Sequence, residues 1–332
     1  MRNIHPAIKR KPCRMNDNVD DTARKTRDIY LTQHKKYHAD TAFFDRFLRM
    51  ASDPSYYHLS KQDFLGKKIL DAGCGNSAYF EVAMGQLGVG HITCLDYGEN
   101  WVEPLQQALS NHGVPGSLCD FVGGSVDNLP FPDNSFDMVF SNGVLMHLRD
   151  LDQINAAFTE MSRVTRPGGY LYVLLGTPGG LFEAELLPAI RRYYRDNREF
   201  RELIDNLNPT HFAELFDIIR QGMARHTKEI LPLNGSQIAT LFSIEFCTFI
   251  QNIVQVPKRI VLEMDEQFVI DSFVNNGFAQ PKRCKRYVKR TDFRQYLAPL
   301  HYDSDNPYSR ILYGPGNLEY IAQKASQKDS SS

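Results

Sequence analysis

The sequence has no long hydrophobic run, almost no net charge and no closely spaced pair of cysteines. No apolar stretch approaches the ~18 residues that a membrane-spanning helix needs. Residues 1–18 carry charges together with Pro6 and Pro12 but no apolar run, which excludes an ordinary secretory signal. We therefore expect a soluble, cytoplasmic protein without membrane insertion.

The net charge is −1 over 332 residues. Such a balance gives no overall attraction to nucleic acid or to an anionic membrane, so any basic patch must be local. Basic residues gather in an N-terminal segment, 1–27, and in a run at 282–290. We interpret 1–27 as a flexible tail, with an RNA-contacting arm as the alternative. We interpret the run at 282–290 as a solvated strand edge, with a contact to an anionic substrate or RNA as the alternative.

The six cysteines are scattered without C-x-x-C or Cys/His spacing: Cys13, Cys74, Cys94, Cys119, Cys247 and Cys284. This spacing predicts neither a zinc site nor a disulfide framework. We expect reduced thiols and no metal, with Cys74 as a small residue that fills a turn.

That turn follows an apolar strand at 67–72 and precedes a helical pattern that begins at Ala78. Gly73 and Gly75 allow backbone angles that other residues avoid, and they leave room for a ligand against the main chain. Asp71 places a carboxylate at the strand end. An acid there would repel a pyrophosphate, whereas it suits the cationic ammonium and sulfonium groups of S-adenosylmethionine (SAM). The third glycine of a dinucleotide fingerprint is also missing.

The Asp71-x-Gly73-x-Gly75 pattern resembles the first motif of class I SAM-dependent methyltransferases. Two later segments extend the resemblance, namely Leu129 to Leu148 (LPFPDNSFDMVFSNGVLMHL) and Arg166 to Leu171 (RPGGYL). They are similar to the LPF…SFD…V…H…PGG series of small-molecule methyltransferases of the ubiquinone and menaquinone type. The resemblance covers roughly residues 65–175.

Strands are predicted near 67–72, 91–96, 118–122, 136–141 and 169–175, alternating with helices near 78–88, 100–112 and 150–165. This alternation predicts an α/β fold with a parallel sheet and helices on both faces. Two further strands, near 282–289 and 317–323, would complete a doubly wound, seven-stranded, mostly parallel sheet of the Rossmann-like methyltransferase type. We predict five parts: the tail at 1–27, cofactor-covering helices at 28–60, a SAM-binding core at 61–176, a helical substrate-cover insertion after strand five at 177–258, and the completion of the sheet at 259–325.

Ligands of such sheets bind at the carboxyl ends of the strands. The resemblance implies that the Gly73–Gly75 backbone and Asp71 hold the methionine end of SAM and that Asp96 holds the ribose hydroxyls. It also implies that Tyr97 lies against the adenine. Tyr30 and Tyr37 are candidate lid residues, with an ordinary packing stripe of the N-terminal helices as the alternative. The full set of predicted cofactor-binding residues is Tyr30, Asp71, Gly73, Cys74, Gly75, Asp96, Tyr97, Ser125, Val126, Asn142 and Gly143.

Two positions near the predicted acceptor site leave alternatives open. Ser125 stands where relatives of this pattern usually carry Asp, so its contact with the adenine would be weaker. His147 is the candidate general base because its ordinary pKa lies near neutrality. The alternative is a structural, hydrogen-bonding histidine, and Glu183, Glu185, His211 and Glu245 are other candidate bases.

The sequence favours methyl transfer to a small-molecule acceptor, largely apolar or aromatic. Ser141-Asn142-Gly143-Val144 is not the Asn-Pro-Pro-aromatic motif of amino-directed nucleic-acid methyltransferases, so nucleic acid is not the expected partner. Two alternatives remain: a methyltransferase acting on RNA or protein, and a SAM-binding protein without catalysis or an oxidoreductase. The oligomeric state is open, with a homodimer among the options.

Overall fold

A computed structural model describes residues 24–32, 41–98, 100–176, 179–224, 244–256, 264–284 and 307–326. Seven strands form one sheet: β1 (Lys68–Ala72), β2 (His91–Asp96), β3 (Cys119–Gly123), β4 (Phe136–Asn142), β5 (Thr165–Leu175), β6 (Lys282–Arg283) and β7 (Leu318–Gln323). Their spatial order is β3-β2-β1-β4-β5-β7-β6. The first five strands pair in parallel, and β7 is antiparallel to both β5 and β6. The predicted seven-stranded, mostly parallel sheet is confirmed.

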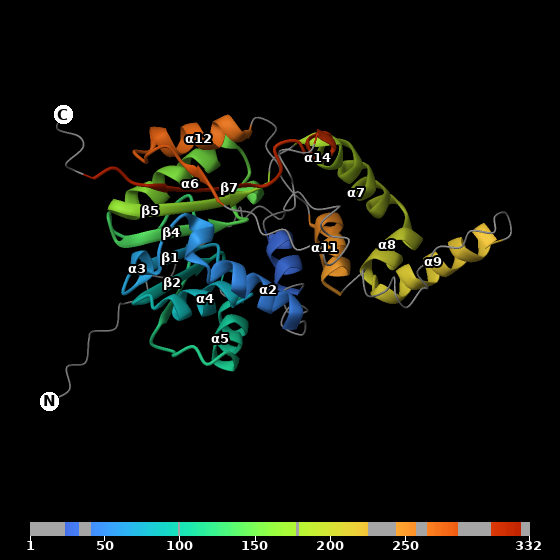
Figure 1. Ribbon diagram of the computed structural model, residues 1–332, viewed down its shortest axis with the longest axis horizontal. Helices are drawn as coiled ribbons and strands as arrows, with labels where there is room; N and C mark the ends of the chain where they lie inside the picture. Colours follow the sequence, from blue (N-terminus) through green and yellow to red (C-terminus); the bar gives the residue numbers. More distant parts are fainter. Residues whose placement is uncertain are drawn as a thin grey trace.

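The sheet is buried on both faces, which is why its strands read as apolar runs. On one side lie α3 (Lys61–Phe64), α4 (Tyr79–Leu87) and α5 (Val102–Asn111), and on the other lie α6 (Leu151–Val164) and α12 (Glu266–Asn275) (Figure 1). Successive residues of β1 enter different cores, since Ile69 packs with the first group and Leu70 with the second. The N-terminal part adds a helix at 24–32, α2 (Thr41–Ala51) and a 3-10 turn η1 (Pro54–Tyr57).

The predicted insertion after β5 is helical. It contains η3 (Phe182–Leu186), α7 (Leu187–Asp196), α8 (Arg198–Asp205), α9 (Pro209–Ala224) and α11 (Ile244–Gln255). α7 and α8 are separate helices, because the Asn197 side chain accepts a hydrogen bond from the Phe200 N–H and so caps a new helix. The insertion is joined to α14 (Pro307–Tyr313) by the rings of Phe182 and Tyr313, whose centroids lie 5.9 Å apart.

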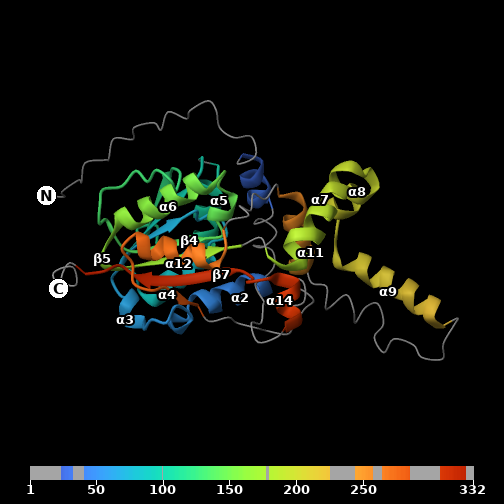
Figure 2. The same ribbon diagram turned by 90° about the horizontal axis from the view of Figure 1, so that it is seen from above.

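The insertion lies at the end of the sheet toward which the parallel strands run (Figure 1). Figure 2 shows the helix at 24–32 beside α11 at this same end. This helix begins inside the segment predicted as the tail, because residues 24–27 are helical and Thr26 is buried, whereas residues 1–23 lie outside the described residues. No helix in the described part of the chain is long and apolar enough to cross a bilayer.

The basic run predicted at 282–290 is described only as far as Cys284. Arg283 is half-buried, where it pairs with Glu266 at 3.1 Å and donates to the carbonyls of Pro315 and Asn317. Its role is therefore to hold β6 against the segment before β7. The prediction for 285–289 falls outside the described residues.

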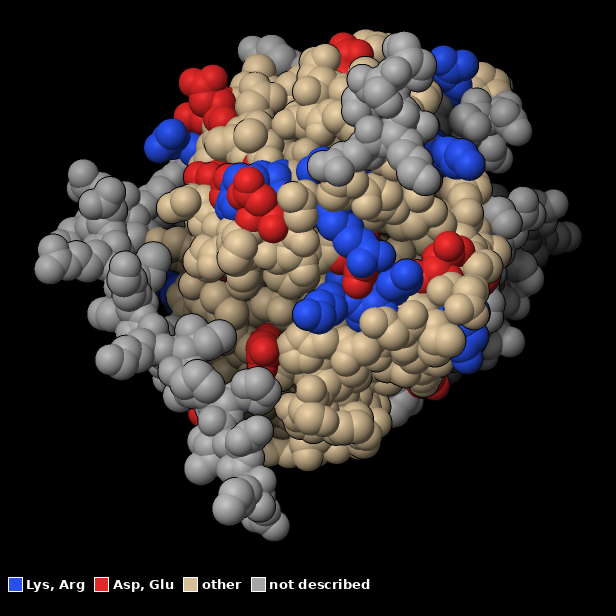
Figure 3. All heavy atoms as spheres, turned by 90° about the vertical axis from the view of Figure 1, so that its left-hand side faces the viewer, with Lys and Arg blue, Asp and Glu red and all other residues tan. Residues whose placement is uncertain are grey.

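Figure 3 views the end opposite the insertion, where basic side chains gather with acidic groups beside them. Ion pairs between side chains far apart in the sequence include Arg166 with Asp137 and Arg163 with Asp133. Arg163 also pairs with Glu160 at 2.8 Å, which lowers the pKa of that carboxyl. These arginines brace the turns around β4 and β5.

A buried carboxyl in β7 gives a test of the core. Glu319 is 2 % exposed, its carboxylate accepts from the Tyr56 hydroxyl, and burial raises its pKa to about 8 from an ordinary value of 4.5. The folded protein holds this proton more tightly than the unfolded chain, so the stability contributed by this group falls as the pH rises from about 4.5 to 8.

We expect Glu319→Gln to raise the free energy of unfolding above neutral pH by up to about 4 kcal/mol and to have little effect near pH 4.5. Urea unfolding of both proteins across this pH range measures the difference. Identical pH dependence in the two proteins would show that Glu319 is ionised in the native state.

Candidate functional site

The turn after β1 needs both of its glycines. Gly73 has φ of 99° and Gly75 has φ of 58°, which lie in the left-handed region. The N–H groups of Gly73 and Cys74 donate to the Leu95 carbonyl at 2.7 and 3.1 Å, which fixes the turn against the end of β2. A Cβ on Gly73 would lie 2.1 Å from a methyl group of Val144. The turn is therefore packed between the ends of β2 and β4.

Asp96 ends β2 and joins two parts of this edge. Its Oδ2 accepts from the Gly75 N–H at 2.7 Å, and its Oδ1 accepts from the Tyr97 N–H at 2.6 Å. Burial raises the pKa of this carboxyl, and the two backbone hydrogen bonds oppose the shift. Each carboxylate oxygen keeps a second lone pair, so a diol can still donate to it.

Asp71 has different surroundings from those that its predicted role requires. It is 5 % exposed, and its carboxyl lies against that of Glu81 on α4. Burial and the neighbouring acids raise its pKa well above the usual range. A neutral, buried carboxyl does not present a negative charge to an ammonium group, so a contact between Asp71 and the methionine end of SAM stays a prediction.

The segment after β3 brings Ser125 and Val126 to the same edge. The Ser125 hydroxyl donates to the carboxylate of Asp127, whose other oxygen accepts from the Gln153 amide at 2.9 Å. Val126 is buried against the core. Relatives carry a carboxylate at the position of Ser125. In this chain the nearby carboxylate is that of Asp127, two residues later.

We expect Ser125→Asp alone to weaken SAM binding several-fold, because the new carboxylate meets that of Asp127. Adding Asp127→Asn removes the second charge and restores binding to at least the original affinity. Calorimetric titration of the single and double variants measures both effects. An undiminished affinity in Ser125→Asp would show that the two side chains separate when SAM binds.

The end of β4 completes the edge. The Asn142 amide donates to the Tyr79 hydroxyl at 3.0 Å, and a Cβ added to Gly143 would meet nothing within 4 Å. Open space at Gly143, after β4, and a half-buried acceptor at Asp96, at the end of β2, fit a nucleoside-bearing cofactor that lies across the end of β1. The described residues thus place the predicted Gly73, Gly75, Asp96, Ser125 and Asn142 along one edge of the sheet, while the contacts of the Tyr97 ring stay a prediction.

A second group of residues lies beyond this edge. The ring of Tyr30, from the helix at 24–32, packs edge-on against that of His147 in η2 (Leu145–His147), with centroids 5.4 Å apart. Burial raises the pKa of Tyr30 to about 12, the positive charge of Arg191 lowers it, and Glu183 raises it. Tyr30 was predicted to contact the cofactor; the structure places it with the candidate base His147 and two ionisable groups of the insertion.

Among the other candidate bases, the structure distinguishes Glu183. It is buried in η3, whereas Glu185 is exposed, and the burial of Glu245 is outside what is described. Arg191 of α7 donates to the Ile253 carbonyl at 2.7 Å, and burial lowers the pKa of its guanidinium. The sequence could not have selected Arg191, because it lies in a row of arginines typical of a solvated helix face.

Arg27 is a further residue that the sequence did not reveal. A Cβ on Gly98 would lie 2.5 Å from the Arg27 guanidinium, and the charge of Arg27 lowers the pKa of Asp96. Arg27 also pairs with Asp28 at 2.9 Å. The helix at 24–32 thus brings a cation to the loop that follows Asp96.

Comparison with known proteins identifies the class of protein domain. Residues 70–173 match the family model described as methyltransferase domain. The chain is 36% identical over 112 residues to a ubiquinone/menaquinone biosynthesis C-methyltransferase of Cupriavidus metallidurans, which covers 33% of this chain and 43% of the relative. It is 34% identical over 108 residues to an uncharacterized methyltransferase of Schizosaccharomyces pombe, covering 31% of this chain and 38% of the relative.

Another relative is a probable tRNA methyltransferase of Homo sapiens, 30% identical over 140 residues, which are 42% of this chain and 28% of the relative. The chain therefore spans less than half the length of each of these relatives. A solved SAM-dependent methyltransferase from Mesorhizobium loti aligns with 82% of this chain and 98% of its own, at 15% identity and a TM-score of 0.44.

The sheet order and the domain match agree with the motif resemblance. Residues 70–173 form the core of a class I SAM-dependent methyltransferase domain, and SAM is the cofactor of this class. The match thus confirms the predicted class of domain and its cofactor for residues 70–173.

Proposed function

We propose that the protein transfers a methyl group from SAM to a small-molecule acceptor that is largely apolar or aromatic. The observation that supports this best is the meeting of Tyr30, His147, Glu183 and Arg191 from three separate elements beyond the carboxyl end of β4. These side chains belong to the N-terminal helix, the loop after β4 and the insertion, which is the arrangement expected of an acceptor site closed on several sides.

Bound SAM supplies an electrophilic methyl group on a sulfonium. Since the protein needs little covalent chemistry for this transfer, its task is to hold the nucleophile in line and to keep water out. Asp96 and the turn at Gly73–Gly75 hold the cofactor end, and Asn142 and Gly143 form the boundary toward the acceptor. The Tyr30 ring, packed against His147, supplies apolar surface beyond that boundary.

His147 is the residue that we propose takes the proton from an O–H or N–H nucleophile. The carboxyl of Glu183, which acts on Tyr30 beside His147, would favour the protonated imidazole, and Arg191 would balance the charge of Glu183. The insertion at 177–258 would then act as the substrate cover, with the helix at 24–32 closing the site from the other side.

The alternative is an RNA or protein acceptor, since one relative is a probable tRNA methyltransferase. The described part of the basic run gives little support to an RNA or protein acceptor, because Arg283 makes contacts within the protein. The basic groups seen in Figure 3 lie at the end of the sheet away from the insertion. These positions favour the small-molecule proposal.

A screen with methyl-labelled SAM tests the proposal. Pools of phenols, quinols and fatty acids are compared with bulk tRNA and with a protein extract, at low and high salt. We expect label in an organic-soluble pool, with a rate that salt changes little. Label in tRNA together with a steep loss of rate with salt would contradict the proposal, since phosphate contacts impose that dependence.

A further inference from the structure

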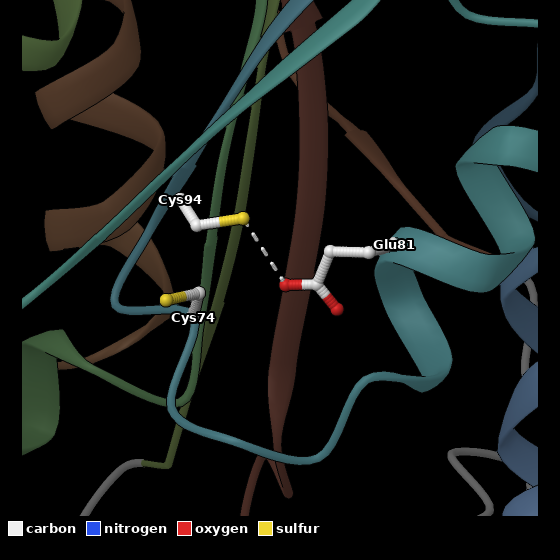
Figure 4. A group of neighbouring side chains, drawn as sticks. All are labelled: Cys74, Glu81 and Cys94. Carbon is white, nitrogen blue, oxygen red and sulfur yellow. Dashed lines mark hydrogen bonds between the residues drawn. The ribbon is translucent and has the colours of Figure 1, made fainter. Parts of the chain in front are cut away.

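A group of buried metal-ligating side chains lies directly beneath the cofactor turn. Cys74 stands between the two glycines, Cys94 lies on β2 and Glu81 lies in the first turn of α4. Figure 4 shows these three side chains arriving from three different elements. Their ligand atoms, two Sγ and one carboxylate oxygen, lie within 4.8 Å of one another.

The fold creates this group although the cysteines lie far apart in the sequence. Asp71 pairs with Cys94 in the parallel register of β1 and β2, so the turn that follows Asp71 returns Cys74 to the same place. Cys119 on β3 is a near neighbour, because β3 pairs Phe121 with Cys94 and Cys119 lies two residues earlier, on the same face of the sheet. Cys119 lies outside the group of three, and its interaction with Cys94 makes its thiol the nearest further candidate ligand.

The spacing suits a tetrahedral ion. Two ligands at ~2.3 Å and ~2.1 Å from a tetrahedral zinc ion are separated by roughly 3.6 Å. The distance from Cys94 Sγ to Glu81 Oε1 is 3.7 Å. Without an ion the Cys94 thiol donates a hydrogen bond to Glu81 over this distance, and the same separation matches two ligands of one ion.

The charges around Glu81 also favour a bound cation. Glu81 is 1 % exposed, and its Oε2 accepts no hydrogen bond from any residue that the structure describes. The ionisable groups that affect Glu81 and Asp71 are acids and thiols, namely the two carboxyls themselves with Asp96, Cys94 and Cys119. Oε1 accepts from the Cys94 thiol, so the unfavourable burial is that of Oε2, and a cation bound by this carboxyl would offset it.

We propose that Cys74, Cys94 and Glu81 bind a thiophilic divalent cation of the zinc type, with the Cys119 thiol or a water as the fourth ligand. Soft thiolate ligands in a tetrahedral arrangement select such ions. On binding, each coordinating thiol releases its proton to the solvent, so the ion is held by thiolates and one carboxylate. The ion fixes the cofactor turn to β2 and α4, although the cysteine spacing alone predicts no metal.

Cobalt(II) is the probe, because tetrahedral thiolate sites give it intense visible and thiolate-to-metal charge-transfer absorption. Under anaerobic, reducing conditions we expect one equivalent to bind to the full chain and zinc(II) to displace it. Cys94→Ser and Glu81→Gln should each lower the cobalt affinity at least tenfold. Cys247→Ser, a buried cysteine on α11, is the matched control and should bind as the unchanged protein does.

Either of two results would overturn the proposal. Absence of the thiolate-to-cobalt absorption in excess cobalt, or equal loss of affinity in Cys247→Ser and Cys94→Ser, would exclude this site. Zinc(II) should also raise the Tm of the unchanged chain and of Cys247→Ser but not that of Cys94→Ser. A zinc-dependent Tm in all three proteins would assign binding elsewhere.

Discussion

Replacing Asp96 with alanine is expected to weaken SAM binding by about two to four orders of magnitude. Two charge-assisted hydrogen bonds to the ribose diol are worth about 1.5–3 kcal/mol each, and about 1.4 kcal/mol corresponds to a tenfold change in Kd. The structure adds a second reason, because Asp96 also accepts the backbone N–H groups of Gly75 and Tyr97. The variant loses both the ribose contact and the bond that holds the turn.

The matched control is Asp120→Ala. Asp120 is an exposed acid on β3 that pairs with His91 at 3.0 Å, away from the cofactor edge. We expect calorimetry to give unchanged SAM affinity for Asp120→Ala and strongly reduced affinity for Asp96→Ala, with both proteins folded. Equal affinity in the two variants would remove Asp96 from the site.

Replacing His147 with asparagine is expected to lower kcat by about 10²–10⁴-fold, the usual contribution of a general base. SAM affinity should stay within a factor of two, because His147 lies against Tyr30 and not at the cofactor turn. The pH dependence of kcat should lose its lower limb, since a base must be unprotonated to act.

If His147 has only a structural role, its replacement should have different effects. Its replacement would lower Tm and SAM affinity together and would leave the shape of the pH profile unchanged. Tyr30→Phe is the matched variant, since it keeps the ring that packs on His147 and removes only the hydroxyl. We expect its kcat to fall less than that of His147→Asn, and the reverse order would make Tyr30 the group that meets the acceptor.

The glycine turn also shows how packing refines a prediction. From the sequence, a side chain at Gly73 would occupy the place of the methionine part of SAM. In the structure, an added Cβ first meets Val144, and the φ of 99° is strained for any other residue. A larger residue at Gly73 thus disturbs the fold as well as the cofactor site, and Asp96 is the cleaner position for testing the site.

The strands were predictable because each is a short apolar run bounded by turn residues. β1, β2, β3 and β4 lie within one residue of the predicted limits, and the carboxyl-end residues Asp96, Ser125 and Asn142 follow from them. Local patterns decide such elements, so a single sequence contains the needed information.

The partners of buried charges were not predictable. Glu81 faces Asp71, and Arg27 approaches Gly98, only because helices pack at particular angles against the sheet. Cys74 and Cys94 meet through strand register, which cysteine spacing does not reveal. Such contacts depend on distances of a few ångströms between elements far apart in the chain.

Titration of the full chain with SAM and, separately, with NADH tests the central claim most directly. The two-glycine turn and the methyltransferase domain match both predict saturable binding of one SAM per chain and no binding of NADH. The same samples should form S-adenosylhomocysteine slowly when an acceptor pool is added. Saturable binding of NADH without binding of SAM would contradict the account.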